Sequence, residues 1–216
     1  HLDLAFNGSD TTLQINQSFR ADAEIGKWLT NTDFRRALSL GIDRDQLNEA
    51  FWLGVGTAGS IAPSPDTLYS PGPEYNKKWA VYDPKQANDL LDKVGLAKKD
   101  GDGYRLRSDG KGRVRLEMIT IGGQFVPFTP VGEMIKQQWK KIGIDVDIKE
   151  LERNLAFTRD NNNENQIITW ANDGSEMLFL FPRHALPVDA AEAHMGMAFA
   201  KWYASNGAAG KKPELV

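Results

Sequence analysis

Apolar residues recur along the chain with two alternating periods, which is the pattern of a protein that mixes strands and helices. Residues 2–6 and 12–19 fit strands, and we expect these two strands to pair. In the second strand Leu13 and Ile15 place their side chains on the same face. The first part of the chain is therefore expected to enter a sheet.

Helices are expected where an aspartate precedes an apolar residue pattern of helical period, because its side chain can cap the first turn. The expected helices are one capped by Asp33 that buries Phe34, Ala37 and Leu38, one starting at Asp43 that buries Leu47, Ala50 and Phe51, and one opened by Asp83 and Pro84 and ended by Gly95. Between them, residues 54–82 are rich in glycine and proline and predict a long ordered loop on the surface.

The second half of the chain predicts strand, helix and strand joined by short connections. Residues 99–121 form a hairpin pattern that ends in a strand with alternating apolar residues, and residues 131–142 follow as a helix stopped by Gly143. The next strand, 144–148, is expected to run parallel to the first, as in a βαβ unit. A helix near 152–160 and an apolar strand at 167–170, covered on both faces, would add a further unit and make the fold class α/β.

Charge and composition exclude several classes of function. The net charge of −3 gives no basic surplus for nucleic acid, and the basic residues of 98–115 alternate with aspartates, as on a solvated hairpin. No segment reaches the roughly 18 apolar residues of a membrane span. The chain has no cysteine, which excludes disulfides and thiolate metal sites.

Motifs that would indicate an enzyme or a metal site have simpler interpretations here. Residues 54–59 match G-x-G-x-x-G, but a helix is expected before them instead of a strand, which favours a plain turn. Asp100 and Asp102 suggest a calcium loop, yet Lys111 stands where its bidentate carboxylate is needed, so a glycine-rich hairpin is favoured. The histidines His1, His184 and His194 lack the spacing of a metal site. We therefore assign no catalytic residue, no metal and no cofactor.

A resemblance to a known family is carried by residues 31–44, NTDFRRALSLGIDR. They are similar to the F-R-x-A-[LI]-x-x-[AG]-[IL]-D-R signature of the family 5 extracellular solute-binding proteins, which bind peptides, nickel or oligosaccharides. Further similar pieces follow in order and extend the resemblance over about residues 10–173: Gly54-x-Gly56 with Pro63, Tyr82-Asp83-Pro84, the Asp-Gly-Asp-Gly hairpin and residues 138–144. The pattern of Trp202, Tyr203, Gly207, Gly210 and Pro213 resembles the C-terminal region of some members.

The resemblance implies an architecture and a role. The fold would be a lobe of the periplasmic-binding-protein type II class, a mixed sheet flanked by helices, with residues 1–173 as the ligand-binding lobe and 174–216 as a crossover and helical tail. Because His1 opens the chain without a signal peptide, we expect a fragment of a longer protein whose first lobe is missing. The whole protein would capture a peptide or related solute between its lobes and deliver it to an ABC permease. It would work in the periplasm or outside the cell, either free or anchored to the membrane as a lipoprotein. The isolated lobe is expected to bind ligands poorly.

The resemblance also nominates a binding site at Trp170, Asn172 and Asp173. Peptide-binding members carry W-x-x-D there, so Asp173 would pair with the α-ammonium group of a peptide; a turn aspartate is the alternative. Trp170 and Asn172 could instead stack on and hydrogen-bond a sugar, or Trp170 could belong to the core. Gly174, Ser175 and Glu176 depart from the peptide-binding pattern, which leaves an oligosaccharide as the rival ligand. An enzyme or an interaction module with the same lobe remains the alternative from another class.

Overall fold

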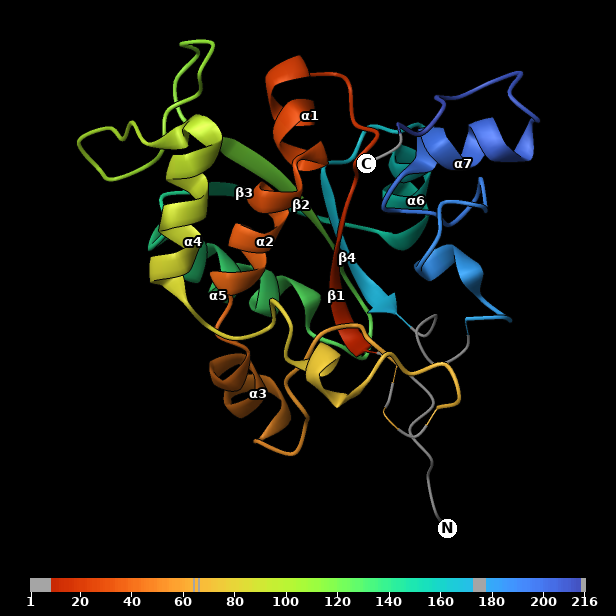
Figure 1. Ribbon diagram of the computed structural model, residues 1–216, viewed down its shortest axis with the longest axis horizontal. Coiled ribbons are helices and arrows are strands. Elements are labelled where there is room, and N and C mark those ends of the chain that lie inside the picture. Colours follow the sequence, from red (N-terminus) through yellow and green to blue (C-terminus); the bar gives the residue numbers. More distant parts are fainter. Residues whose placement is uncertain (1–8, 64, 66, 173–177, 215–216) are drawn as a thin grey trace.

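The computed structural model describes residues 9–63, 65, 67–172 and 178–214 (Figure 1). A mixed sheet lies at the centre, with helices on both sides. The strands are β1 (Ser9–Ile15), β2 (Arg115–Ile121), β3 (Asp145–Leu151) and β4 (Ile167–Asn172). The α-helices are α1 (Ala23–Thr30), α2 (Thr32–Leu40), α3 (Arg44–Trp52), α4 (Pro84–Leu91), α5 (Phe128–Lys140), α6 (Arg153–Asn161) and α7 (Met197–Ala204), with short helical turns at Pro73–Asn76, Asp92–Leu96 and Pro182–His184.

The strand order β1-β4-β2-β3 confirms the expected mixed sheet. Strands β2 and β3 are parallel and joined through α5, as expected for a βαβ unit, and β4 is parallel to β2. Strand β1 runs antiparallel to β4 along one edge. The three parallel strands therefore end at the same side of the sheet.

The larger core lies on the face of the sheet that is covered by α1, α2, α4 and α5. Alternate residues of β2, among them Leu116 and Met118, point into it, together with Ile167 of β4. Gly132 lets α5 lie close, because a Cβ atom there would come within 3.1 Å of side-chain atoms of Thr120 and Ile148. The alternation of buried residues along β2 thus assigns one face of the sheet to this core.

A smaller core lies on the opposite face, under α6. It consists of buried Ile119, Ile121, Phe128, Ala156 and Ile168. The segment before α7 packs nearby, since the backbone N–H of Gln17 donates to the carbonyl of Met195 and that of Ala198 to Ser18 Oγ. The helix α7 lies in the expected C-terminal tail and beside α6 (Figure 1). The division of the chain at residue 173 stays a prediction.

Several helix and strand boundaries differ from the expectations. Helix α2 is capped by the side chain of Asn31, so Asp33 lies in the first turn and is not the cap. Asp43 caps α3 as expected, but Ala50 is exposed, because α3 buries a narrower stripe than its sequence suggested. The strand expected at 12–19 is β1, which starts earlier and ends at Ile15. The strand expected at 2–6 lies outside the described residues.

One basic residue of the hairpin is not solvated, contrary to expectation. Arg105 is 0% exposed. Its guanidinium donates to the carbonyls of Ile142 and Leu96, to Asp92 and to Asn88 at distances from 2.5 to 3.3 Å. A buried charge is tolerated when its donors are all paired, and this one ties the hairpin to the end of α4 and to the turn after α5.

Candidate functional site

The candidate site lies at the carboxyl ends of the parallel strands. In open α/β sheets this is the side where ligands bind, because the loops that leave the strands converge there. The segments that leave β2, β3 and β4 begin at Gly122, Glu152 and residue 173. Residues that are far apart in sequence are therefore gathered at one end of the sheet (Figure 1).

Trp170 occupies this end of β4 and is partly buried among aromatic rings. Its ring centroid is 5.9 Å from that of Phe128, at the start of α5, and 5.3 Å from that of Phe157 on α6. The guanidinium of Arg153 lies 5.0 Å from the indole centroid. The core-packing and ligand-facing interpretations of Trp170 thus both have a basis, since the ring packs on the smaller core and keeps part of its surface accessible.

Asn172 lies at the last position of β4, opposite Ser9 of β1. Asn172 is 4% exposed and Trp170 is partly exposed, so Trp170 offers the larger accessible surface of the two. The register of β1 and β4 shifts between Ser9 and Thr12, and irregularities of this kind often occur beside binding sites, where they redirect side chains. Asp173, the expected partner of a ligand cation, lies outside the described residues.

The structure adds residues to this end that sequence reasoning did not nominate. Arg153 is exposed at the first position of α6, and Phe125, in the loop after β2, is 109% exposed. Thr129 Oγ1 donates to Glu150, whose carboxylate lies beside the end of β2. Each of these residues lies at the end of a strand of the parallel set or in the segment that follows one. The rule that ligands bind at the carboxyl ends of parallel strands could therefore have predicted them from the sequence.

The hairpin carboxylates bind basic side chains of the protein itself. Asp100 accepts from the backbone N–H groups of Asp102 and Tyr104, and Arg113 forms ion pairs with Asp100 and Asp102. This arrangement supports the hairpin interpretation over a calcium loop. No group of potential metal ligands occurs in the part of the chain that the structure describes.

A second ion-pair cluster joins the hairpin to α1. Arg107 donates to Asp109 at 2.6 Å and to Asp22, the N-cap of α1, at 2.7 Å. The hydrogen bonds from Arg107 lower the pKa of Asp109 to about 2, and they also lower the pKa of Asp22. These shifts arise from pairing within the lobe and lie away from the strand ends, so they indicate stability instead of a reactive group.

The remaining motifs also have structural roles. Residues 54–59 follow α3, and Gly54 has a φ of 73°, which confirms a turn where a nucleotide fingerprint would need a preceding strand. Among the described residues, no helix is long and apolar enough to cross a bilayer.

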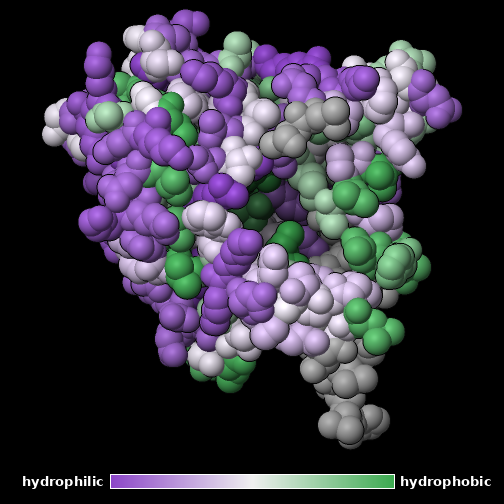
Figure 2. All heavy atoms as spheres, viewed as in Figure 1, coloured by the Kyte–Doolittle hydropathy of each residue, from purple (hydrophilic) through white to green (hydrophobic). Residues whose placement is uncertain are grey.

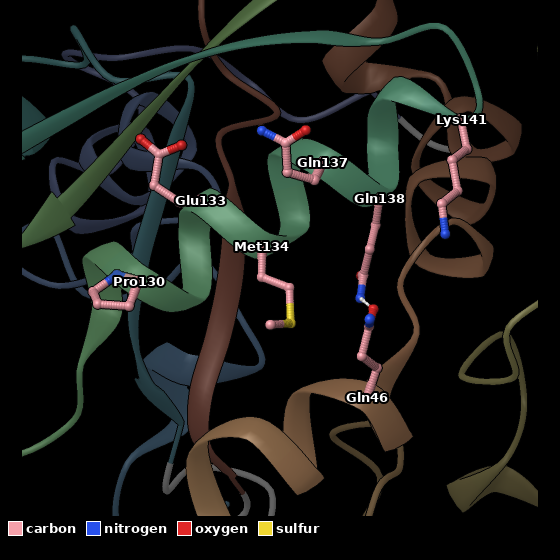
Figure 3. Close-up of a pocket in the computed structure, with 7 residues that line it drawn as sticks. All are labelled: Gln46, Pro130, Glu133, Met134, Gln137, Gln138 and Lys141. Carbon is pink, nitrogen blue, oxygen red and sulfur yellow. Dashed lines mark hydrogen bonds between the residues drawn. The ribbon is translucent and has the colours of Figure 1, made fainter.

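A separate surface pocket of about 520 Å³ lies along α5, on its side toward α3. Met134 and Gln138 point toward α3, and Gln138 Nε2 donates to Gln46 Oε1 at 2.9 Å (Figure 3). The lining residues are Gln46, Pro130, Glu133, Met134, Gln137, Gln138 and Lys141. None of them was nominated from the sequence. The pocket runs along the outside of the helix layer, so we do not assign the site to it.

Comparison with known proteins identifies relatives of the chain. The model of "Bacterial extracellular solute-binding proteins, family 5 Middle" matches residues 4–181. A periplasmic alpha-galactoside-binding protein of Rhizobium meliloti (strain 1021) is 31% identical over 127 residues, which cover 56% of this chain and 18% of that protein.

Solved structures agree with this match. The chain superposes on an oligopeptide-binding protein, OppA, with a TM-score of 0.78 and 30% identity, covering 96% of this chain and 33% of that one. The periplasmic binding protein MelB of Agrobacterium fabrum C58, in complex with stachyose, shares the fold with a TM-score of 0.67 and 20% identity, over 87% of this chain and 29% of that one. The chain thus spans a third or less of the length of these relatives.

Proposed function

The chain belongs to the bacterial extracellular solute-binding proteins of family 5, and from that premise we propose that it supplies one ligand-binding wall of an ABC importer's capture protein. The relatives named above are binding proteins, and this role needs no catalytic residue. The proposal rests mainly on the position of Trp170 at the carboxyl ends of the parallel strands. A ligand would be held against this end by the rest of the protein.

The proposed site comprises Trp170, Asn172 and Asp173. Trp170 would contribute the accessible part of its indole, and Asn172 would contribute a polar residue at the end of β4. A charge-assisted hydrogen bond from a ligand cation to Asp173 would strengthen in a closed cleft, where it is worth roughly 1.5–3 kcal/mol. Arg153 and Phe125 extend the same surface with a cation and an exposed ring.

Two ligand classes are supported by different observations. A peptide is supported by the similarity to OppA and by Asp173 in the W-x-x-D arrangement. An oligosaccharide is supported by the identity with the alpha-galactoside-binding protein and by the aromatic surroundings of Trp170, because sugar rings stack on aromatic faces. We propose the peptide as the first candidate and the oligosaccharide as the second.

A binding screen on the complete gene product that carries this sequence tests the proposal. Di- to octapeptides and neutral oligosaccharides such as raffinose are added in a thermal-shift assay, followed by calorimetry on the compounds that stabilise the protein. We expect one class to bind with micromolar or tighter affinity. If neither class binds, the proposed function is wrong.

Variants assign the site within that screen. Trp170→Ala should weaken binding of either class, whereas Trp52→Ala, a partly buried tryptophan on α3, should leave it unchanged. Asp173→Asn should weaken binding of peptides but not of neutral sugars. Full peptide affinity in Asp173→Asn would remove that residue from the site.

The partners and the location follow from the same proposal. The relatives named above include periplasmic proteins, and we propose that this protein also works in the periplasm or outside the cell, with an ABC permease as its membrane partner. We also propose that the 216 residues alone bind ligands poorly, because they span a third or less of the length of the relatives named above and other parts of the protein would complete the cleft. Micromolar or tighter binding by this chain alone in calorimetry would contradict that.

A further inference from the structure

A row of three rings in contact, Trp170, Phe157 and His194, joins the proposed binding site to the C-terminal tail. Trp170 meets the edge of Phe157, with centroids 5.3 Å apart and planes at 81°. Phe157 in turn stacks on His194, with centroids 5.4 Å apart and planes at 26°. His194 lies in the segment before α7, so the row reaches from β4 across α6 to a part of the chain outside the sheet.

Helix α6 forms the middle of this row. Arg153, Phe157 and Asp160 are spaced by four and three residues and therefore share one face of the helix. The guanidinium of Arg153 lies 5.3 Å from the Phe157 centroid and 5.0 Å from that of Trp170. One helix face thus contacts the tryptophan at one end and the histidine at the other.

His194 is fixed by an ionisable partner on the same helix face. Its Nδ1 lies 2.5 Å from Asp160 Oδ2, and the two side chains are 1% and 0% exposed. The other carboxylate oxygen, Oδ1, is buried and has no hydrogen-bond partner among the described residues. Because a buried carboxylate must be paired, the placement of Asp160 depends on His194.

We propose that His194 is a positioning residue for Trp170. It holds Phe157 by stacking and Asp160 by hydrogen bonding, and Phe157 holds the indole in its edge-to-face orientation. The relevance to binding rests on the proposed function, but the coupling between the two side chains does not. The tail would then set the orientation of a wall residue without touching the ligand.

Fluorine NMR of the chain labelled with 5-fluorotryptophan tests this coupling without a ligand. The chain contains six tryptophans, and a Trp170→Phe variant assigns the resonance of Trp170. In His194→Ala we expect the Trp170 resonance to shift by more than its line width, while the resonances of Trp28 and Trp139 in the larger core stay in place. An unchanged Trp170 resonance in a folded His194→Ala variant would overturn the proposal.

A double variant separates positioning from general destabilisation. His194→Phe with Asp160→Leu keeps a ring against Phe157 and removes the buried charge together with its partner. We expect this variant to retain the wild-type Trp170 resonance, and a shifted resonance would contradict positioning through the ring stack. If His194→Ala does not fold, so that all six resonances collapse, His194→Leu with Asp160→Leu replaces it, because this pair removes the ring and the buried charge together. A shifted Trp170 resonance in that variant supports the proposal, and an unchanged one overturns it.

A ligand arm distinguishes this proposal from the proposed function. Raffinose and trialanine are titrated into the labelled complete gene product while the Trp170 resonance is followed. If neither probe binds and the ligand screen also finds nothing, the proposed function fails, whereas the outcome of the His194 variants still stands.

Discussion

The two faces of the sheet are built differently. The face under α1, α2, α4 and α5 buries a continuous apolar core that includes Trp28, Phe34 and Trp139. The face under α6 buries few apolar residues and is completed by polar contacts, among them the His194–Asp160 pair and a buried cluster around Asn16. Figure 2 shows the molecule hollowed between its main body and the side that carries the tail.

The difference shows how one small lobe can separate stability from recognition. The free energy gained by apolar packing grows with the buried area and does not depend on direction. It can therefore stabilise the first face without fixing any one polar group. Hydrogen-bonded and stacked groups have defined geometry, and on the second face the rings of Phe128 and Phe157 contact Trp170 while His194 stacks on Phe157. Trp170, which we propose contacts a ligand, therefore lies where neighbouring rings specify the geometry closely.

The largest expected effect is on the first face. Trp139 is 0% exposed, and its Nε1 donates to the carbonyl of Leu38 at 2.9 Å. Trp139→Ala should reduce the free energy of unfolding by about 3–5 kcal/mol, because it leaves a large cavity. Urea denaturation followed by circular dichroism measures it. Phe157→Ala, on the partly buried second face, is the matched comparison and should cost less; an equal or larger loss would break the distinction between the faces.

An intermediate effect is expected in the polar cluster of the second face. The side-chain amide of Asn16 donates to the carbonyl of Asn165 at 3.0 Å, and its oxygen accepts from the backbone N–H of Ser18 at 3.0 Å. Asn16→Ala should lower the free energy of unfolding by about 1–3 kcal/mol, since it leaves buried groups unpaired. Hydrogen exchange at Ser18 and Ala198 should accelerate in the variant. A neutral substitution would show that this cluster does not hold the second face.

The smallest effect is a pH dependence at the Arg107 cluster beside α1. The pKa of Asp109 is about 2 in the folded protein, below its ordinary value of 3.8. A lowered pKa means that the contribution of this carboxylate is present above 3.8 and is lost as the pH falls toward 2. Asp109→Asn should therefore be slightly less stable than the wild type at neutral pH, and the difference should disappear as the pH falls through about 2 in the same denaturation assay. A difference that persists at acid pH would assign the effect to another contact.

The sequence was sufficient for the features that depend on local patterns. The βαβ unit, the cap at Asp43 and the opening of α4 at Asp83 are confirmed, because periodicity and capping act within a few residues. The burial of Arg105 could not be predicted, since its partners come from residues 88–96 and from Ile142. Phe157 and His194 were missed for the same reason: the ring stack that links them to Trp170 exists only after the tail folds back on α6.

The sheet order has a consequence for the behaviour of the chain in solution. Strand β3 pairs with β2 on one side and forms an edge of the described sheet. The unpaired backbone groups of an edge strand can pair with a strand of another molecule, and such pairing leads to aggregation. Asp147, Lys149 and Glu150 are exposed along β3, and such charges oppose the approach of a second strand. The strand that completes the parallel set thus also opposes aggregation of the protein through its edge.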